Sequence, residues 1–197
     1  RWKVRALNEN GSPATDWSDA RNFSMAADQD QYIVPDPAGL WTKAIQTAHP
    51  RSLPRGDELI RLKGLLFGDR AQDLASLKAR LQKNVGAALP VEPGQMFNKM
   101  DADVARSRAM GDVRNRLQDE EDAIRSLGLL WHIERNEVWL KEARLRALHL
   151  ARWDPEGTSG LVSHNQATRT IMLSLAFALD CFYDNWSASE KQLLLHS

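Results

Sequence analysis

Apolar and polar residues alternate with the period of an α-helix over most of the chain. Leu74, Leu77 and Leu81 share one face of a predicted helix over 71–85, because residues three and four apart lie on the same side of a helix. Similar spacing predicts further helices over 40–48, from Asp57 as the N-cap through Leu66, over 101–130, and from Asn136 as the N-cap to Arg152. The proline-containing segment 89–94 interrupts the series as a loop. The pattern predicts a mainly α fold made of antiparallel helix pairs.

The last part of the chain carries the clearest helix boundaries. Ser163 is a predicted N-cap with Gln166 three residues later, and the helix that follows over 167–184 is apolar on most of its circumference. A helix that is apolar all round is a buried one. Ser187 and Glu190 have the spacing of a second capping box, which predicts that another helix opens near Ser197. We therefore expect the sequence to end inside a repeating helical array.

The first 25 residues follow a different pattern, in which apolar and polar residues alternate as in a strand. Trp2 and Val4 share one face, residues 10–13 form a break, and Trp17 and Phe23 belong to a return segment. Two strands do not stay folded alone in water, so we expect this end to pack poorly without further cover. No initiator methionine or apolar signal region precedes the pattern, which indicates a start within a domain.

The segment from Leu175 to Lys191, LAFALDCFYDNWSASEK, resembles the first toroid helices of heparinase II/III-like polysaccharide lyases. His49-Pro50-Arg51 resembles the H-P-R entry to those helices, and residues 1–25 resemble the end of the small fibronectin-III-like β-sandwich that precedes the toroid. The resemblance implies a β-hairpin remnant of a sandwich over 1–25, a linker over 26–38, and an incomplete α/α toroid over 39–197.

Composition narrows the classes of partner. The 26 basic and 26 acidic residues give zero net charge, which provides no general attraction to nucleic acid or to an anionic membrane. No run of residues approaches the roughly 18 consecutive apolar residues of a membrane helix. Cys181 is the only cysteine and lies in the apolar helix, so we expect it to be a small core residue. Any polyanionic partner must be held by local groups.

A polar stripe runs along the apolar helix and consists of Asn165, Arg169, Asp180 and Asp184. At about 100° per residue, these positions fall within about a third of the helix circumference. The lyase resemblance implies that Asn165 and Arg169 offset the carboxylate charge of a uronic acid, which makes its C5 proton easier to remove. The structural alternative is that Arg169 and either Asp180 or Asp184 form an ion pair or bond to helix ends, since buried charges need partners.

His164 and Trp153 complete the predicted substrate-binding residues. The dipole of the helix favours the neutral form of the His164 ring, which can accept a proton, although the position also suits an ordinary surface histidine. Trp153 precedes the Asp154-Pro155 turn, where it could stack on a sugar ring or plug the end of the helix layer; Trp186 offers the same two possibilities. The remaining histidines have no second ligand at helical spacing, so we expect neither a metal site nor a cofactor.

The resemblance implies that the parent protein cleaves uronic-acid-containing polysaccharides, of the glycosaminoglycan or alginate type, by β-elimination in the periplasm or outside the cell. The family's catalytic Asn-His pair and tyrosine lie on later helices, so we expect the catalytic residues to follow Ser197. Two other functions stay open. A glycoside hydrolase or sugar epimerase can use the same fold, and a carbohydrate-binding or scaffold module needs no catalytic residues.

Overall fold

The computed structural model describes residues 3–22, 39, 48–101 and 104–196. The chain divides into two compact units, Arg1–Ala44 and Ile45–Ser197. The described part is mainly helical, which confirms the predicted fold class at that level. The predicted linker over 26–38 and nearly all of the predicted helix over 40–48 lie outside the described residues, as do Trp2 and Phe23.

Residues 3–22 form a loose turn in which no strand is assigned. An antiparallel bridge pairs Leu7 with Pro13, and Gly11 closes the turn with a φ of 80°, a conformation that glycine adopts without steric cost. Val4 and Trp17 expose 56% and 55% of their surface. This segment therefore buries little of its own apolar surface. Backbone hydrogen bonds from Ala14 to Ala6 and from Ser18 to Val4 join its two sides, but no regular strand is assigned among the described residues, so the predicted strand pair stays a prediction.

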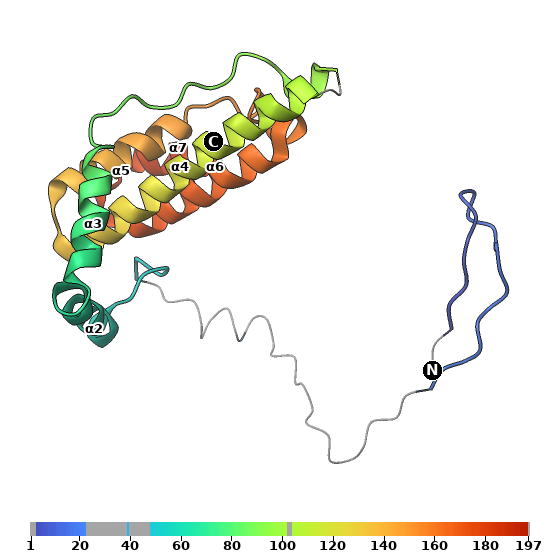
Figure 1. Cartoon of the computed structure of the whole chain (residues 1–197), viewed down its shortest axis with the longest axis horizontal. Helices are drawn as coiled ribbons and strands as arrows, with labels where there is room; N and C mark the ends of the chain where they lie inside the picture. The colour runs from blue at the N-terminus through green and yellow to red at the C-terminus, as the bar shows by residue number, and fades with distance from the viewer. Residues whose placement is uncertain (1–2, 23–38, 40–47, 102–103, 197) are drawn as a thin grey trace. The chain divides into compact units, whose positions relative to one another are not determined.

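The unit that follows contains the helices α2 (Gly56–Phe67), α3 (Ala71–Gln82), α4 (Val104–Glu134), α5 (Glu137–Leu150), α6 (Leu161–Cys181) and α7 (Ala188–His196), with the short 3-10 helices η1 (Phe97–Lys99) and η2 (Tyr183–Asn185). The long helices α4, α5 and α6 lie side by side (Figure 1). Only Arg135 and Asn136 separate α4 from α5, so these two form an antiparallel hairpin. Among the described helices, none combines the length and the apolar character required to cross a membrane.

The core lies between α4, α5 and α6. On α4 the charged first turns are exposed and the later part of the helix is buried, as the sequence predicted; the buried residues include Leu117, Ile124, Leu127 and Leu130. Gly128 lets α6 come close, because a Cβ at this position would lie 2.8 Å from Cε1 of Phe177 and 3.1 Å from Sγ of Cys181. Cys181 is buried as predicted, and burial raises the pKa of its thiol to about 12.

A charged cluster is buried beside this core. The guanidinium of Arg146, on α5, donates to Glu142 at 2.8 Å and to both carboxylate oxygens of Glu120 at 2.7 and 2.8 Å. Its Nη2 donates to the carbonyl of Asn84 at 2.6 Å. Because each of these groups has a hydrogen-bond partner, the cluster avoids the large cost of an unpaired buried charge.

The predicted helix caps have mixed outcomes. Asn136 caps α5 by accepting a hydrogen bond from the N–H of Val138, and Ser187 and Glu190 form the predicted reciprocal box at the start of α7. The Ser163 cap is wrong, because its hydroxyl accepts from the N–H of Phe97 instead. The Asp57 cap is also wrong, since α2 begins one residue earlier and Asp57 lies in its first turn.

The helix predicted over 167–184 differs from α6 at both ends. It begins at Leu161 and ends at Cys181, where the chain continues into η2. The prediction of an all-round buried helix was wrong, because Met172 and Leu173 expose 61% and 46% of their surface. Within the described residues, the side of α6 away from α4 and α5 has no packed neighbour over these positions.

Candidate functional site

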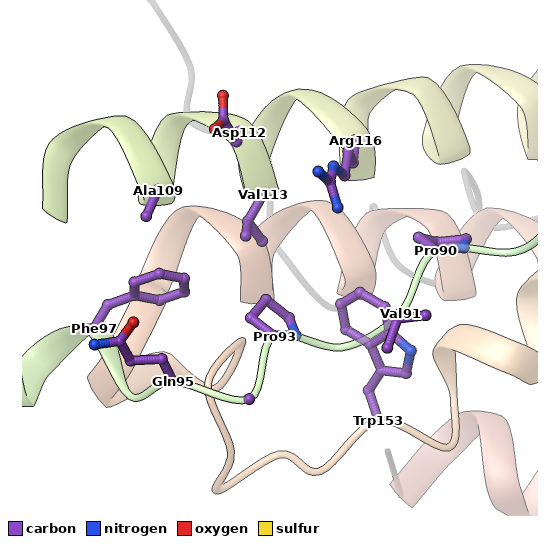
Figure 2. A pocket seen from close by; sticks show the side chains of 11 residues that line it. Pro90, Val91, Pro93, Gln95, Phe97, Ala109, Asp112, Val113, Arg116 and Trp153 are labelled. Carbon is purple, nitrogen blue, oxygen red and sulfur yellow. The ribbon is translucent and has the colours of Figure 1, made fainter. Parts of the chain in front are cut away.

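A pocket of about 260 Å³ lies between the loop after α3 and the first half of α4. Its lining is mostly apolar, with two charged side chains, and consists of Pro90, Val91, Pro93, Gly94, Gln95, Phe97, Ala109, Asp112, Val113, Arg116 and Trp153. Figure 2 shows Phe97 and Trp153 at opposite ends of the pocket, with Pro93 between them and α4 along the other side. The arrangement gives a short apolar trough with polar groups at its border.

The loop that forms one wall is tied to the turn between α5 and α6. The carboxylate of Glu92 accepts from the N–H of Asp154 at 3.1 Å and from the hydroxyl of Ser159 at 3.0 Å. The hydroxyl of Thr158 donates to the carbonyl of Pro93. The turn itself needs glycine at position 160, because a Cβ there would collide with the carbonyl oxygen of Pro155.

Two more hydrogen bonds hold the ends of the same loop. Nε2 of His149, on α5, lies 2.6 Å from the carbonyl oxygen of Pro90 and 3.3 Å from Nε1 of Trp153. At the other end the N–H of Phe97 donates to Ser163 at 3.0 Å. A segment without helix or strand is thereby fixed by side chains of α5 and α6, which preorganises the pocket for a ligand.

The charged residues of the pocket face in different directions. Figure 2 shows the guanidinium of Arg116 directed toward the loop near Trp153, whereas the carboxylate of Asp112 is directed away from the loop. Both side chains belong to exposed residues, and the ion pairs formed by the described residues do not include Arg116. The pocket therefore presents an available cation beside an apolar floor.

The four predicted substrate-binding residues do not converge. Trp153 lines the pocket and is 8% exposed. His164 is 2% exposed and lies behind Phe97, whose ring meets it edge to face at 5.6 Å. Asn165 and Arg169 are exposed on α6 and are not part of the pocket lining.

The His164 ring is held by backbone groups on both sides. Its Nε2 lies 2.8 Å from the carbonyl oxygen of Met110, and its Nδ1 accepts from the N–H of Ala167 at 3.4 Å. His164 also has non-helical φ and ψ angles inside α6, so its ring acts as the cap of the helical segment that follows. The structural role accounts for both ring nitrogens.

The predicted ion pair of Arg169 with an aspartate of the stripe is absent from the described residues. Asp180 instead accepts from the His49 ring at 2.7 Å, from the N–H of Arg51 at 2.8 Å, and from both the N–H and the hydroxyl of Ser52. Burial opposes ionisation of Asp180, but these hydrogen bonds outweigh it and lower the pKa of the carboxyl. Asp180 thus holds the H-P-R segment against α6.

Trp186 is buried in the helix layer and is not placed to stack on a sugar ring. It is 5% exposed, and its Nε1 donates to the carbonyl of Ala178 at 3.1 Å. Phe182 meets its ring edge to face, and the guanidinium of Arg144 lies 4.9 Å from its centroid. Trp186 therefore plugs the junction between α6 and α7.

Sequence reasoning missed Arg116 and Phe97 as site residues. Both join Trp153 in the lining of one pocket only because the loop after α3 folds back over α4, and no local pattern encodes that path. The one available signal was the pair of prolines at positions 90 and 93, which favours an extended segment that can lie along a helix.

The described residues contain no group of three or more His, Cys, Asp or Glu side chains placed to hold a metal ion. Comparison with protein-family models and with curated proteins finds no match for the chain.

Proposed function

We propose that this chain is part of a polysaccharide lyase that cleaves uronic-acid-containing polysaccharides by β-elimination, and that it contributes substrate binding. The observation that carries the proposal is the pocket in which Arg116 faces an apolar trough ended by Trp153 and Phe97. The apolar face of a sugar ring can pack on aromatic and proline side chains. A guanidinium beside it suits the carboxylate of an acidic sugar.

The arrangement of the helices supports the same proposal. The antiparallel pair α4 and α5 and the capped start of α7 follow the pattern expected for successive helical hairpins. The resemblance in the segment from Leu175 to Lys191 adds the reaction class. In this proposal the proton-transferring residues lie outside the chain given, and the pocket holds a sugar unit away from the bond that is cleaved.

The test uses the full-length parent protein with purified alginate, polygalacturonate and glycosaminoglycans. β-Elimination leaves an unsaturated sugar, so the expected result is a rise in ultraviolet absorbance with at least one of these substrates. Arg116→Gln should raise KM for that substrate about tenfold, because it removes a charge-assisted contact. Arg108→Gln, an exposed arginine on the same helix, serves as the matched control.

The two open alternatives give different results in the same experiment. A hydrolase would release new reducing ends without ultraviolet absorbance, and an epimerase would change sugar stereochemistry without shortening the polymer. A binding module would retain the polysaccharide without any product. Each of these results would overturn the lyase proposal. The position of Asp180 argues against its use as a hydrolytic acid, because several donors already occupy its carboxylate.

A further inference from the structure

A second, more open pocket lies at the start of α2. It has a volume of about 790 Å³ and is lined by Arg51, Ser52, Leu53, Pro54, Arg55, Gly56 and Glu58. It shares no lining residue with the pocket around Trp153. Two of its lining side chains are arginines, and Glu58 is the acidic side chain at its border.

The loop that carries the two arginines is fixed from three directions. Asp180 accepts from the N–H groups of Arg51 and Ser52 at 2.8 Å. Nε2 of His132, on α4, lies 2.7 Å from the carbonyl oxygen of Pro54. Nη1 of Arg55 donates to the carbonyl of Ala48 at 2.7 Å. The backbone between the arginines is therefore held in place, and their spacing does not depend on a ligand.

More cations gather around the same loop. Burial lowers the pKa of His132, the hydrogen bond to Pro54 opposes that effect, and the charges of Arg135, Lys63 and Arg55 lower it further. Arg135 also stacks over the Trp131 ring at 4.7 Å.

This concentration of positive charge is not neutralised by the described residues. Their ion pairs include neither Arg51, Arg55, Lys63 nor Arg135, whereas Lys78, Arg144 and Arg146 are each paired with glutamate. The carboxylates at the pocket are Glu58, which forms no ion pair with either lining arginine, and Asp180, whose oxygens accept from the backbone of the loop. Like charges held close together repel each other, and an anion placed among them removes that repulsion. Arginine is well suited to the role because its planar guanidinium binds oxyanions through two N–H groups.

We propose that the pocket lined by Arg51 and Arg55 binds an oxyanion group, sulfate or carboxylate; that this group belongs to a polysaccharide rests on the function proposed above. The site is distinct from the pocket of Arg116 and Trp153, and its binding of an anion does not depend on whether the parent protein is a lyase. Arg51 and Arg55 contact the anion, while Lys63 and Arg135 add long-range attraction. Neutral sugars are not ligands of this site.

The test is isothermal titration calorimetry of the chain at physiological ionic strength with oligosaccharides of dextran sulfate, of polygalacturonate and of unmodified dextran. We expect saturable binding of at least one of the two anionic oligosaccharides, and the stronger of them identifies the preferred anion. Arg51→Gln/Arg55→Gln should weaken that binding about tenfold, because two charge-assisted contacts are lost.

The matched control is Arg108→Gln/Arg152→Gln. It removes the same net charge from exposed residues, and Arg152, like Arg55, donates Nη1 to one carbonyl. We expect binding within about twofold of the unmodified chain, because a specific site depends on local contacts more than on total charge. The single variant Arg51→Gln tests whether weaker binding could come from misfolding, because no described hydrogen bond or ion pair uses the Arg51 side chain. We expect it to weaken binding while the circular dichroism spectrum stays unchanged.

Three results would overturn the proposal. The first is the absence of saturable binding to either anionic oligosaccharide. The second is equal weakening in the Arg51/Arg55 and Arg108/Arg152 variants, which would indicate general charge attraction. The third is equal binding of unmodified dextran. An Arg116→Gln variant separates the two pockets: it removes the cation of the first pocket and should leave the component of binding that depends on Arg51 and Arg55 unchanged.

Discussion

Asp180 and His49 are 131 positions apart in the sequence, yet Oδ1 of the aspartate and Nδ1 of the histidine lie 2.7 Å apart. The histidine ring stacks on Tyr183 with 3.9 Å between centroids and 9° between planes, and Lys191 lies 3.8 Å from the centroid of the tyrosine ring. One carboxylate therefore joins the segment before α2 to the end of α6.

Asp180→Asn should release that segment. The asparagine amide places N–H groups where the aspartate accepted hydrogen bonds from Arg51 and Ser52, so at least one charge-assisted bond is lost at a cost of about 2 kcal/mol. Urea unfolding should show the loss, and hydrogen exchange should speed up at the amides of Arg51 and Ser52. Asp184→Asn, at an exposed position, is the control. Unchanged exchange at those two amides would contradict the anchoring role.

The same anchor gives a pH dependence with a definite sign. The folded pKa of Asp180 lies below its ordinary value, so the stabilisation is present above an unfolded pKa of about 4 and is lost as pH falls through the folded value. The difference in unfolding free energy between the unmodified chain and Asp180→Asn should shrink as pH falls from 5 to 3. A difference that stays constant over this range would show that ionisation of Asp180 does not matter.

His132 should make the chain less stable in mild acid. Burial lowers its pKa in the folded state, so stability is complete above an unfolded pKa of about 6.5 and falls as pH drops toward the folded value. His132→Gln keeps an N–H donor for Pro54 but does not titrate, and it should lose less stability than the unmodified chain between pH 7 and 5. The exposed His196→Gln is the control. Equal pH dependence of all three in urea titrations would count against the prediction.

Removing Arg146 should be among the most costly single changes. Its 3% exposed side chain lies between two glutamates, and truncation to leucine leaves both carboxylates buried without it, at a cost of about 3–5 kcal/mol. Arg70→Leu, which breaks an exposed pair with Asp73, should change the unfolding free energy by less than about 1 kcal/mol. Similar losses of unfolding free energy in the two variants would mean that burial does not increase the cost of breaking an ion pair.

Gly128→Ala and Gly111→Ala should change stability in opposite directions although both lie on α4. A Cβ at position 128 would lie 2.8 Å from the Phe177 ring, and such overpacking costs about 1–3 kcal/mol. A Cβ at position 111 meets nothing within 4 Å, so the higher helix propensity of alanine should stabilise by up to about 1 kcal/mol. Chemical denaturation measures the change in unfolding free energy for each variant. An increase in stability for Gly128→Ala would contradict the prediction, because it would mean that α6 can move away from α4 at little cost.

The helices were predictable from local signals and the site was not. The stripe of Leu74 and Leu81 and the cap at Asn136 are encoded within a few residues, so spacing and side-chain chemistry are sufficient for them. Ser163 has the same local signature as a cap, but the N–H of Phe97, 66 positions away, competes for its hydroxyl. Tertiary contact decides between such alternatives, and the sequence pattern contains no information about it.

The polar stripe on α6 shows a similar limit. Helical periodicity predicts a common side for Asn165, Arg169 and Asp180, but it does not tell which partner each one meets. Asp184, the fourth residue of the predicted stripe, lies in η2 beyond the end of α6. Asp180 is satisfied by a segment that precedes α2, and Arg169 stays exposed. The pocket of Arg116 and Trp153 depends on a loop whose path is fixed by Glu92, Thr158 and His149, and none of these residues belongs to a recognisable motif.

Both pockets are bounded by a proline whose carbonyl is held by a histidine on a neighbouring helix, Pro90 by His149 and Pro54 by His132. Neither histidine lines the pocket that it positions. A substitution at His132 or His149 can therefore abolish ligand binding without removing any ligand contact. In a mutational screen, these two positions would score as binding residues, and only a measurement of loop position would separate them from the residues that touch the sugar.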